Sequence, residues 1–174
     1  MTDLTNSHGA LFDDPVLIRG SASGSRPSLG QIGLQHFAPY LINSISLSWT
    51  TYLADALKTH DMTITKMRAL AILSISSPVT INELSFYALT EQSTMSRTLD
   101  ALEDQGLIVR KPRAEDLRVR DVDITQAGRD AFAKVWPGMY ELLLKMLDGV
   151  DVEEYKAFIA TLHKIIRNIG KHDL

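Results

Sequence analysis

The stretch from Thr80 to Gly106, TINELSFYALTEQSTMSRTLDALEDQG, decides the fold of this 174-residue chain. Thr80 and Glu83 have the spacing of a capping box, in which each side chain bonds to a backbone N–H at the start of a helix. We therefore predict a short helix that begins after Thr80 and ends near Ala88. Helical spacing of apolar residues predicts a second helix over 91–105, which stops at the glycine that follows it. Two short helices joined by a tight turn indicate a helix-turn-helix.

The second predicted helix has two different faces. Met95, Leu99 and Leu102 fall on one side, where we expect them to pack on the core. The opposite side carries short hydroxyls and one arginine near the helix start. This composition suits the major groove of DNA, because small side chains allow close approach and arginine can bond to guanine with two hydrogen bonds. By itself, however, this pattern favours the alternative interpretation, an ordinary helix face exposed to solvent. The outward residues are Ser93, Ser96, Arg97 and Asp100.

After Gly106 the periodicity changes from helical to extended. Residues 107–109 predict a strand, 112–117 a polar turn, and Val122 with Ile124 a returning strand, which together form a β-hairpin. Residues 107–120 hold five Lys or Arg against two acidic residues, so the segment carries 5 − 2 = +3 in a chain of net charge −3. A basic hairpin on an acidic body is consistent with local phosphate contact, although a solvated loop would explain the charge equally well.

Helical periodicity predicts four further helices around this region. The N-terminal stretch is rich in Ser, Gly, Asp and Pro and lacks such periodicity, so we predict an arm with at most a short strand at 16–18. In the helix that follows Thr63, we expect the inward side to carry Met67, Leu70 and Ala71. The predicted helices cover 36–58, a segment from the N-cap Thr63 to about 76, a segment from Thr125 to about 147 with a kink at Pro137, and a segment capped by Asp151 and Glu154 that ends at Gly170.

The composition limits the other functions open to the chain. It has no cysteine, which excludes disulfides, thiolate metal sites and cysteine nucleophiles. The five histidines include no i, i+4 pair, and phosphate-loop, G-x-S-x-G and dinucleotide motifs are missing, so we expect no metal, no cofactor and no enzyme activity. No apolar run approaches the ~20 residues that cross a bilayer, and the N-terminus lacks the features of a signal peptide. We therefore expect a cytoplasmic protein.

The stretch from Asn82 to Gly128 resembles the signature region of MarR-family transcriptional regulators. The most specific parts are STMSRTLDALE at 93–103, GLIVR at 106–110, EDLR at 115–118 and ITQAG at 124–128. The flanking helices match in position and extend the resemblance to about 37–170, whereas the arm has no counterpart. One departure is Leu89, where many relatives have glycine in the turn.

The resemblance implies a mainly α fold with a small β-hairpin wing. It divides the chain into an N-terminal arm at 1–35 and a single unit at 36–174. Within that unit, a winged helix-turn-helix lobe at 60–125 lies between dimerisation helices at 36–58 and 126–174.

The resemblance also implies which residues meet DNA. The helix over 91–105 enters the major groove, and Arg118 enters the minor groove with Asp116 orienting its guanidinium. Arg113 and Arg120 flank this point and are expected at phosphates. The complete set of expected DNA contacts is Thr80, Gln92, Ser93, Thr94, Ser96, Arg97, Arg113, Asp116, Arg118 and Arg120.

The first and last helices carry more apolar surface than a lobe of this size can cover. The resemblance implies that they intertwine with a second subunit, which gives a homodimer and a pseudo-palindromic operator. A monomeric helical bundle is the alternative. The expected dimerisation residues are Phe37, Leu41, Tyr155, Phe158, Leu162, Ile165, Ile166 and Ile169.

MarR-like proteins often bind small aromatic or phenolic anions between the dimerisation helices and the DNA-binding lobe. Amphipathic position suggests Tyr40, Asn43, Trp49, Arg68 and Trp136 for such an effector site, although for the two tryptophans we favour ordinary core packing. The function predicted is a ligand-responsive repressor. The alternatives are a winged-helix interaction module without DNA binding, and an enzyme that uses the winged helix only to dimerise. An outward Arg97 and an Asp116 and Arg118 pair in the wing favour DNA binding, and no residues remain for a cofactor domain.

Overall fold

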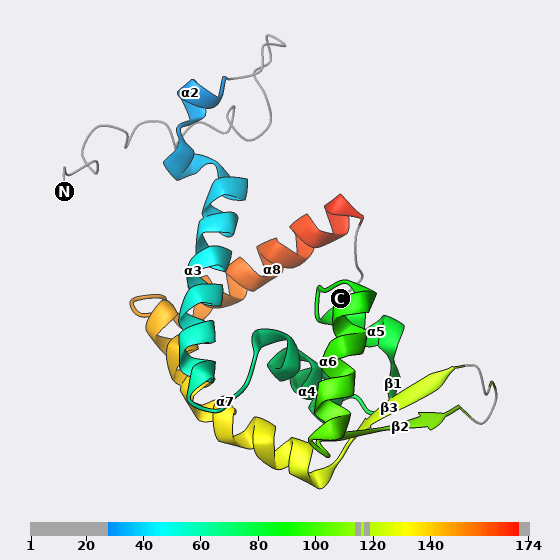
Figure 1. The fold of residues 1–174 in the computed structure, drawn as a ribbon. Coiled ribbons are helices and arrows are strands. Elements are labelled where there is room, and N and C mark those ends of the chain that lie inside the picture. The colour runs from blue at the N-terminus through cyan, green and yellow to red at the C-terminus, as the bar shows by residue number, and fades with distance from the viewer. Residues whose placement is uncertain (1–27, 114–115, 117–118, 171–174) are drawn as a thin grey trace. The chain divides into compact units, whose positions relative to one another are not determined.

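The computed structural model describes residues 28–113, 116 and 119–170 (Figure 1). The strand expected at 16–18 and the expected minor-groove residue Arg118 lie outside these ranges. The elements in chain order are α2 (Leu29–Ile32), the 3-10 helix η1 (Leu34–His36), α3 (Ala38–Lys58), α4 (Ile64–Ile75), β1 (Val79–Thr80), α5 (Ile81–Tyr87), α6 (Gln92–Asp104), β2 (Ile108–Pro112), β3 (Arg120–Ile124), α7 (Gln126–Met146) and α8 (Val152–Ile169).

The chain divides into two compact units, residues 1–52 and 53–174. The described part of the first unit contains α2, η1 and most of α3, and α2 was not predicted. The second unit holds the remaining elements and is a mainly helical winged helix-turn-helix with a small antiparallel sheet, as predicted. The division falls within α3, so the domain boundaries inferred from the resemblance stay a prediction. Among the described residues, no helix is both long and apolar enough to span a membrane.

The helix starts follow the capping residues that the sequence indicates. Thr63 Oγ1 accepts a hydrogen bond from the Lys66 backbone N–H at 3.2 Å, and Thr125 Oγ1 accepts one from the Gly128 N–H at 3.1 Å. Asp151 and Glu154 form the predicted capping box at the start of α8. These bonds satisfy backbone donors that have no partner inside the helix. The predicted starts of α4, α7 and α8 are therefore confirmed.

The core of the second unit lies between α4, α5, α6 and the sheet. The inward side of α6 is completely buried there, as predicted, together with Leu84 from α5 and Ile108 and Val122 from the sheet. One detail of α4 differs from the prediction: Ala69 is fully buried, whereas Ala71 is only half-buried. The face of α4 that packs on the core carries Leu73, and a helix places residue 69, four positions earlier, on that same face.

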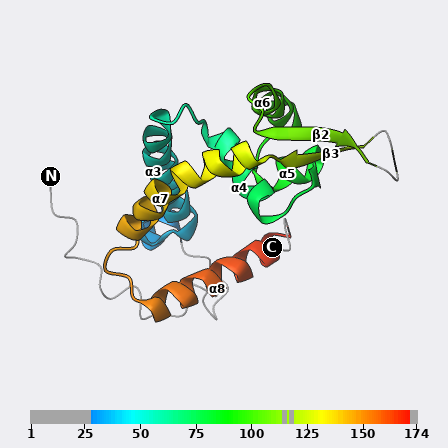
Figure 2. The ribbon, with the colours of Figure 1, turned by 90° about the horizontal axis from the view of Figure 1, so that it is seen from below.

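The sheet has three antiparallel strands in the order β1-β3-β2. The predicted hairpin is confirmed: Ile108 pairs with Ile124, and Arg110 pairs with Val122. Its first strand is longer than predicted, because Pro112, expected in the turn, pairs with Arg120. The sequence did not indicate β1, which adds Val79 opposite Val122. Two views show the hairpin of β2 and β3 extending away from α4 (Figures 1 and 2). The hairpin is therefore placed as the wing of the helix-turn-helix.

Candidate nucleic-acid interface

The outward face of α6 is the centre of the candidate site. Its inward residues, Met95, Leu99 and Leu102, have no solvent exposure, which fixes the helix rotation about its axis. Ser93, Thr94 and Arg97 are exposed and Ser96 is half-buried. Among the described residues, no group forms a hydrogen bond or ion pair with the Arg97 guanidinium. The face that we expect to meet DNA thus presents small hydroxyls and an uncommitted arginine.

The turn between α5 and α6 keeps its geometry with leucine in place of the glycine of many relatives. Leu89 adopts φ 54°, in the left-handed region. Its N–H donates to Phe86 O at 3.1 Å, and the Thr90 N–H donates to Ser85 O at 3.0 Å. These two bonds form a Schellman motif that ends α5 and turns the chain toward α6. The departure from the family pattern leaves the turn intact, with Leu89 in a strained conformation.

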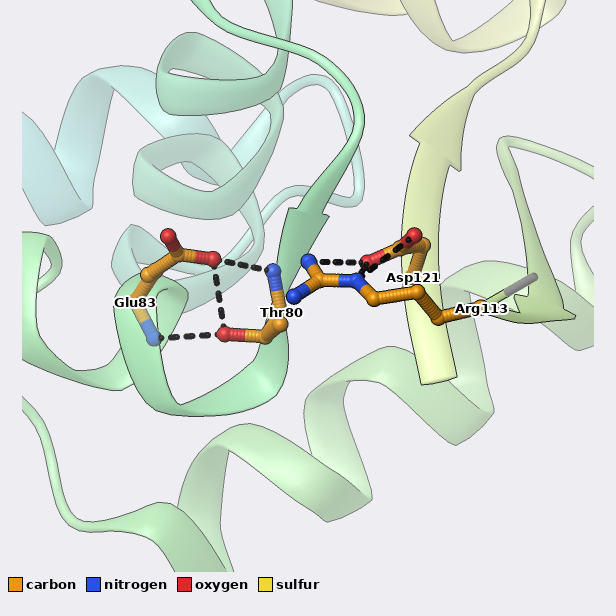
Figure 3. A network of polar contacts seen from close by, with 4 residues as sticks. All are labelled: Thr80, Glu83, Arg113 and Asp121. Carbon is orange, nitrogen blue, oxygen red and sulfur yellow. Dashed lines mark hydrogen bonds and ion pairs between the residues drawn. The ribbon is translucent and has the colours of Figure 1, made fainter. Parts of the chain in front are cut away.

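The capping box at the start of α5 forms as predicted. Thr80 N–H donates to Glu83 Oε2 at 2.6 Å, and the Thr80 hydroxyl both donates to Oε2 at 2.7 Å and accepts from the Glu83 N–H (Figure 3). The backbone N–H and then the hydroxyl of Thr80 lower the pKa of Glu83, and the positive charge of Arg113 lowers it further. The Thr80 hydroxyl, expected at DNA, is therefore engaged within the protein, and its contact with DNA stays a prediction.

Arg113 lies where the paired strands of the wing end and its tip begins. It directly follows β2, and its guanidinium extends toward Asp121 on β3 (Figure 3). The Nη2 atom lies 2.6 Å from Asp121 Oδ1, and Nε donates to both carboxylate oxygens at 3.0 and 3.2 Å. A bidentate pair of this kind has a defined geometry. Arg113 thus holds the two wing strands together, and its expected phosphate contact stays a prediction.

Arg110 links the wing to α6. Its Nη2 lies 2.5 Å from Glu103 Oε2 and 2.8 Å from Asp100 Oδ1, and its backbone N–H donates to Glu103 Oε1 at 3.0 Å. The hydrogen bond from Arg110 lowers the pKa of Glu103, and the same bond raises the pKa of Arg110. Asp100 is exposed as expected, but its carboxylate faces Arg110.

These ion pairs change the interpretation of the basic hairpin. Arg110 and Arg113, two of its five cations, are paired with carboxylates of the protein. Lys111 and Arg120 are exposed at the surface of β2 and β3. The Asp116 carbonyl accepts a hydrogen bond from the Val119 N–H at 2.9 Å. Its pairing with Arg118 falls on a residue outside the described part and stays a prediction.

One polar contact at the site was missed by the sequence analysis. Gln92, the first residue of α6, donates from Nε2 to Asn82 Oδ1 on α5 at 2.8 Å. No motif marks Asn82, because the contact depends on the angle between two helices whose contacting residues are ten positions apart. The bond ties an expected DNA-contact residue to a side chain that had no assigned role.

The expected effector residues lie on three helices in two units. Tyr40, Asn43 and Trp49 belong to the first unit, and Arg68 donates to Ala88 O at 3.1 Å within the second. Trp136 lies on α7 with its ring centroid 5.9 Å from that of Phe132 and 6.0 Å from that of Tyr140. The expected core packing is not seen for Trp136, which is 49% exposed in the single chain, whereas Trp49 is half-buried. Within the described ranges, His, Asp and Glu residues form no cluster able to hold a metal.

The expected dimerisation residues lie at the two ends of the described chain. Phe37 and Leu41 are exposed at and near the start of α3. The others lie on α8, in which no residue is buried. Phe158 and Ile169 are exposed, and Tyr155, Leu162, Ile165 and Ile166 are half-buried.

The elements described above define a winged helix-turn-helix protein. Two short helices are joined by a tight turn, the second has an outward polar face, and an antiparallel wing adjoins them. The model of the MarR family matches residues 60–118. A crystal structure of a MarR-family transcriptional regulator from Silicibacter pomeroyi is 38% identical, with a TM-score of 0.79 over 85% of this chain and 100% of that one. The chain therefore belongs to the MarR family and is a DNA-binding transcriptional regulator.

One curated protein and two further solved structures are similar at lower identity. The HTH-type transcriptional repressor IacR of Pseudomonas putida is 23% identical over 143 residues, which cover 82% of this chain and 86% of IacR. CouR from Rhodococcus jostii RHA1, in a structure with p-coumaroyl-CoA, is 17% identical with a TM-score of 0.69 over 76% of this chain and 94% of CouR. MepR from S. aureus, in a complex with DNA, is 22% identical with a TM-score of 0.66 over 75% of this chain and 95% of MepR.

Proposed function

We propose that this regulator is a ligand-responsive repressor that binds a pseudo-palindromic DNA operator as a homodimer. The observation that carries the proposal is the outward face of α6, where exposed hydroxyls surround an arginine with no partner among the described residues. A helix with this face can enter the major groove, because its short side chains allow close approach and Arg97 is able to donate two hydrogen bonds to guanine.

Repression and the effector rest on the relatives. IacR is named a transcriptional repressor, and MepR is seen bound to DNA. CouR is seen bound to p-coumaroyl-CoA, an aromatic acyl thioester, which supports an aromatic effector here. We assign that effector to the predicted residues Tyr40, Asn43, Trp49, Arg68 and Trp136. A repressor of chromosomal genes works where the chromosome is, which agrees with the expected cytoplasmic location.

The exposed apolar stripe of α8 supports the proposed dimer. An apolar stripe on a helix without a buried residue is costly to leave in water, and a second copy is the partner that a two-fold operator requires. Each subunit then places one α6 in the major groove, with equivalent points of the two half-sites about 10 bp apart or a multiple of that distance.

The test begins with selection of bound fragments from the source genome by the purified full-length protein. We expect recovery of a pseudo-palindromic sequence upstream of a gene. The Arg97→Ala variant should lose affinity for that sequence by about 1–3 kcal/mol with its melting temperature unchanged, since Arg97 is exposed and supports no internal contact. Arg167→Ala removes an exposed arginine near the end of α8, outside the helix-turn-helix, and is the matched control.

Failure to select any sequence would favour the alternative of an interaction module without DNA binding. Selection of a sequence with unchanged affinity in Arg97→Ala would show that α6 is not the element that contacts the bases. An aromatic acid or its coenzyme A thioester that releases the selected fragment would support the effector, whereas binding unaffected by such compounds would contradict it.

A further inference from the structure

Within the part of the chain that the structure describes, the hydrogen bond between Asn82 and Gln92 is the one side-chain to side-chain bond that joins α5 and α6. Gln92 Nε2 donates to Asn82 Oδ1 at 2.8 Å, and both side chains are exposed to solvent. Asn82 lies in the first turn of α5 and Gln92 is the first residue of α6, so the bond lies at the start of the expected recognition helix. An exposed bond between two flexible carboxamides contributes little stability, because water competes for both groups. Its value lies in the orientation that it gives the Gln92 amide.

The chemistry that remains on Gln92 is specific. A carboxamide has two N–H donors and one carbonyl acceptor, and the bond to Asn82 occupies one donor. One N–H and the Oε1 acceptor are left over, and no other described residue bonds to them. A donor beside an acceptor matches the major-groove edge of adenine, which offers an acceptor at N7 and a donor at N6. Guanine offers two acceptors at that edge and would require two donors.

We propose that Asn82 is a positioning residue for base recognition, holding the Gln92 carboxamide so that it recognises an adenine in each operator half-site. The proposal rests on the proposed operator binding and goes beyond it, because it names the base and the residue that orients the contact. Fixing the amide before DNA arrives also reduces the rotamer entropy lost on binding. Asn82 is not required to touch the base.

The proposal is tested on the operator selected with the wild-type protein, with each base pair of one half-site varied in turn. We expect one position at which the wild type prefers adenine by roughly 5- to 150-fold over the other bases, the discrimination of a good bidentate contact. Gln92→Ala should remove this preference. Asn82→Ala should reduce the preference at the same position by several-fold and at no other. In the Gln92→Ala background, Asn82→Ala should have no further effect on it, because the two residues act as one unit.

Two further variants separate orientation from stability. Asn82→Asp keeps an oxygen that can accept from Gln92, so it should retain the adenine preference while its negative charge weakens binding to all sequences alike. Gln126→Ala removes an exposed amide that donates to Asp130 at 2.9 Å on α7, and should leave base preference unchanged. Melting temperatures of all variants should stay close to that of the wild type.

The outcomes are distinguishable. A wild-type protein that selects no operator contradicts the proposed function itself. Selective binding with unchanged base preference in both Asn82→Ala and Gln92→Ala overturns the role of the pair and leaves the proposed function intact. A guanine preference at the position that responds to Gln92 would mean that Gln92 presents two donors, and would overturn the orientation proposed here.

Discussion

Leu89 and Gly106 occupy the same position in two equivalent turns. At Gly106, which ends α6, the N–H donates to Glu103 O at 2.8 Å and the following N–H donates to Leu102 O at 2.9 Å, the same Schellman pattern that Leu89 forms after α5. The φ angle is 71° at Gly106 and 54° at Leu89. Glycine adopts this left-handed conformation without strain, whereas an L-residue with a Cβ loses roughly 1–2 kcal/mol there. The chain therefore contains one relaxed and one strained version of the same helix end.

We expect Leu89→Gly to stabilise the protein. The strain removed exceeds the roughly 0.4–1 kcal/mol by which glycine increases the entropy of the unfolded chain, so the net gain is about 0.5–1 kcal/mol. Little hydrophobic burial is lost, since Leu89 is 73% exposed. Urea unfolding of both proteins measures the difference. Gly106→Ala is the control and should lose about 1 kcal/mol, because a Cβ there meets no atom within 4 Å and only backbone strain is added. A Leu89→Gly protein that is less stable than the wild type would show that Leu89 is not strained.

The lowered pKa of Glu83 predicts how stability depends on pH. The folded pKa lies below the ordinary value of 4.5, so the ionised carboxylate stabilises the fold above that value, and this contribution is lost as the pH falls through the folded pKa. The free energy of unfolding of Glu83→Gln should be below that of the wild type at pH 7, and the gap should narrow below pH 4.5. Glu141→Gln on α7 is the control for charge. A gap of constant size at every pH would contradict the prediction.

Sequence and structure agree best where the determining contact is local. The caps at Thr63, Thr80, Thr125 and Asp151 could be predicted because the cap and its donor are two or three residues apart. Hydrogen-bond and ion-pair partners that lie on different elements could not be predicted from the sequence. The two carboxylates that hold Arg110 and the Asn82 oxygen that holds Gln92 depend on how helices and strands cross.

At the scale of elements, Arg110 fixes the wing strand β2 to α6. Arg110→Met retains much of the aliphatic stem and removes the guanidinium, so the bonds to Asp100 and Glu103 are lost. We expect a loss of about 1 kcal/mol, below the range for buried charged bonds, because the two carboxylates are 57% and 36% exposed and regain water. Urea unfolding measures this loss.

Lys111→Met is the matched control for the Arg110 variant. Lys111 is the next residue on β2, is exposed, and forms no ion pair with a described residue, so its loss should leave stability within the error of the measurement. Equal losses of stability from the two substitutions would show that the loss comes from removing a positive charge, and not from breaking the contact between β2 and α6.

Element types could be predicted from the sequence better than their neighbours. The hairpin and the helices from α3 onward could be predicted from periodicity and capping residues, whereas the four-residue helix α2 was not predicted. The strand β1 has only two residues, too few for a period, and exists because Val79 and Thr80 pair with β3. Gly128, the last residue of the ITQAG segment, shows another long-range cause. A Cβ there would lie 2.1 Å from Leu107 O, so glycine allows the start of α7 to approach the chain that enters β2.

At the scale of the whole molecule, the winged helix-turn-helix buries its apolar residues in a core of its own, whereas the apolar residues of α8 are not buried in the single chain. The fully buried large side chains come from α3, α4, α5, α6 and the sheet, and none from α8. Periodicity predicted the apolar stripe of α8 but not its partner, because a sequence pattern shows that a face is apolar and not which surface covers it. The proposed second subunit supplies that cover.

The dimer is tested on α8 itself. We expect the wild type to sediment at micromolar concentration with twice the 19.3 kDa mass of the chain. Phe158→Glu places a charge in the apolar stripe, at a side chain 45% exposed in the single chain, so it should shift the protein toward the monomer without unfolding the DNA-binding core. Ala160→Glu adds the same charge on the opposite, exposed side of α8, and should remain dimeric. Operator affinity should fall with the dimer in Phe158→Glu alone, because one subunit contacts only one half-site. A wild type that sediments as a monomer, or equal dimerisation of both variants, would show that this stripe is not the subunit interface.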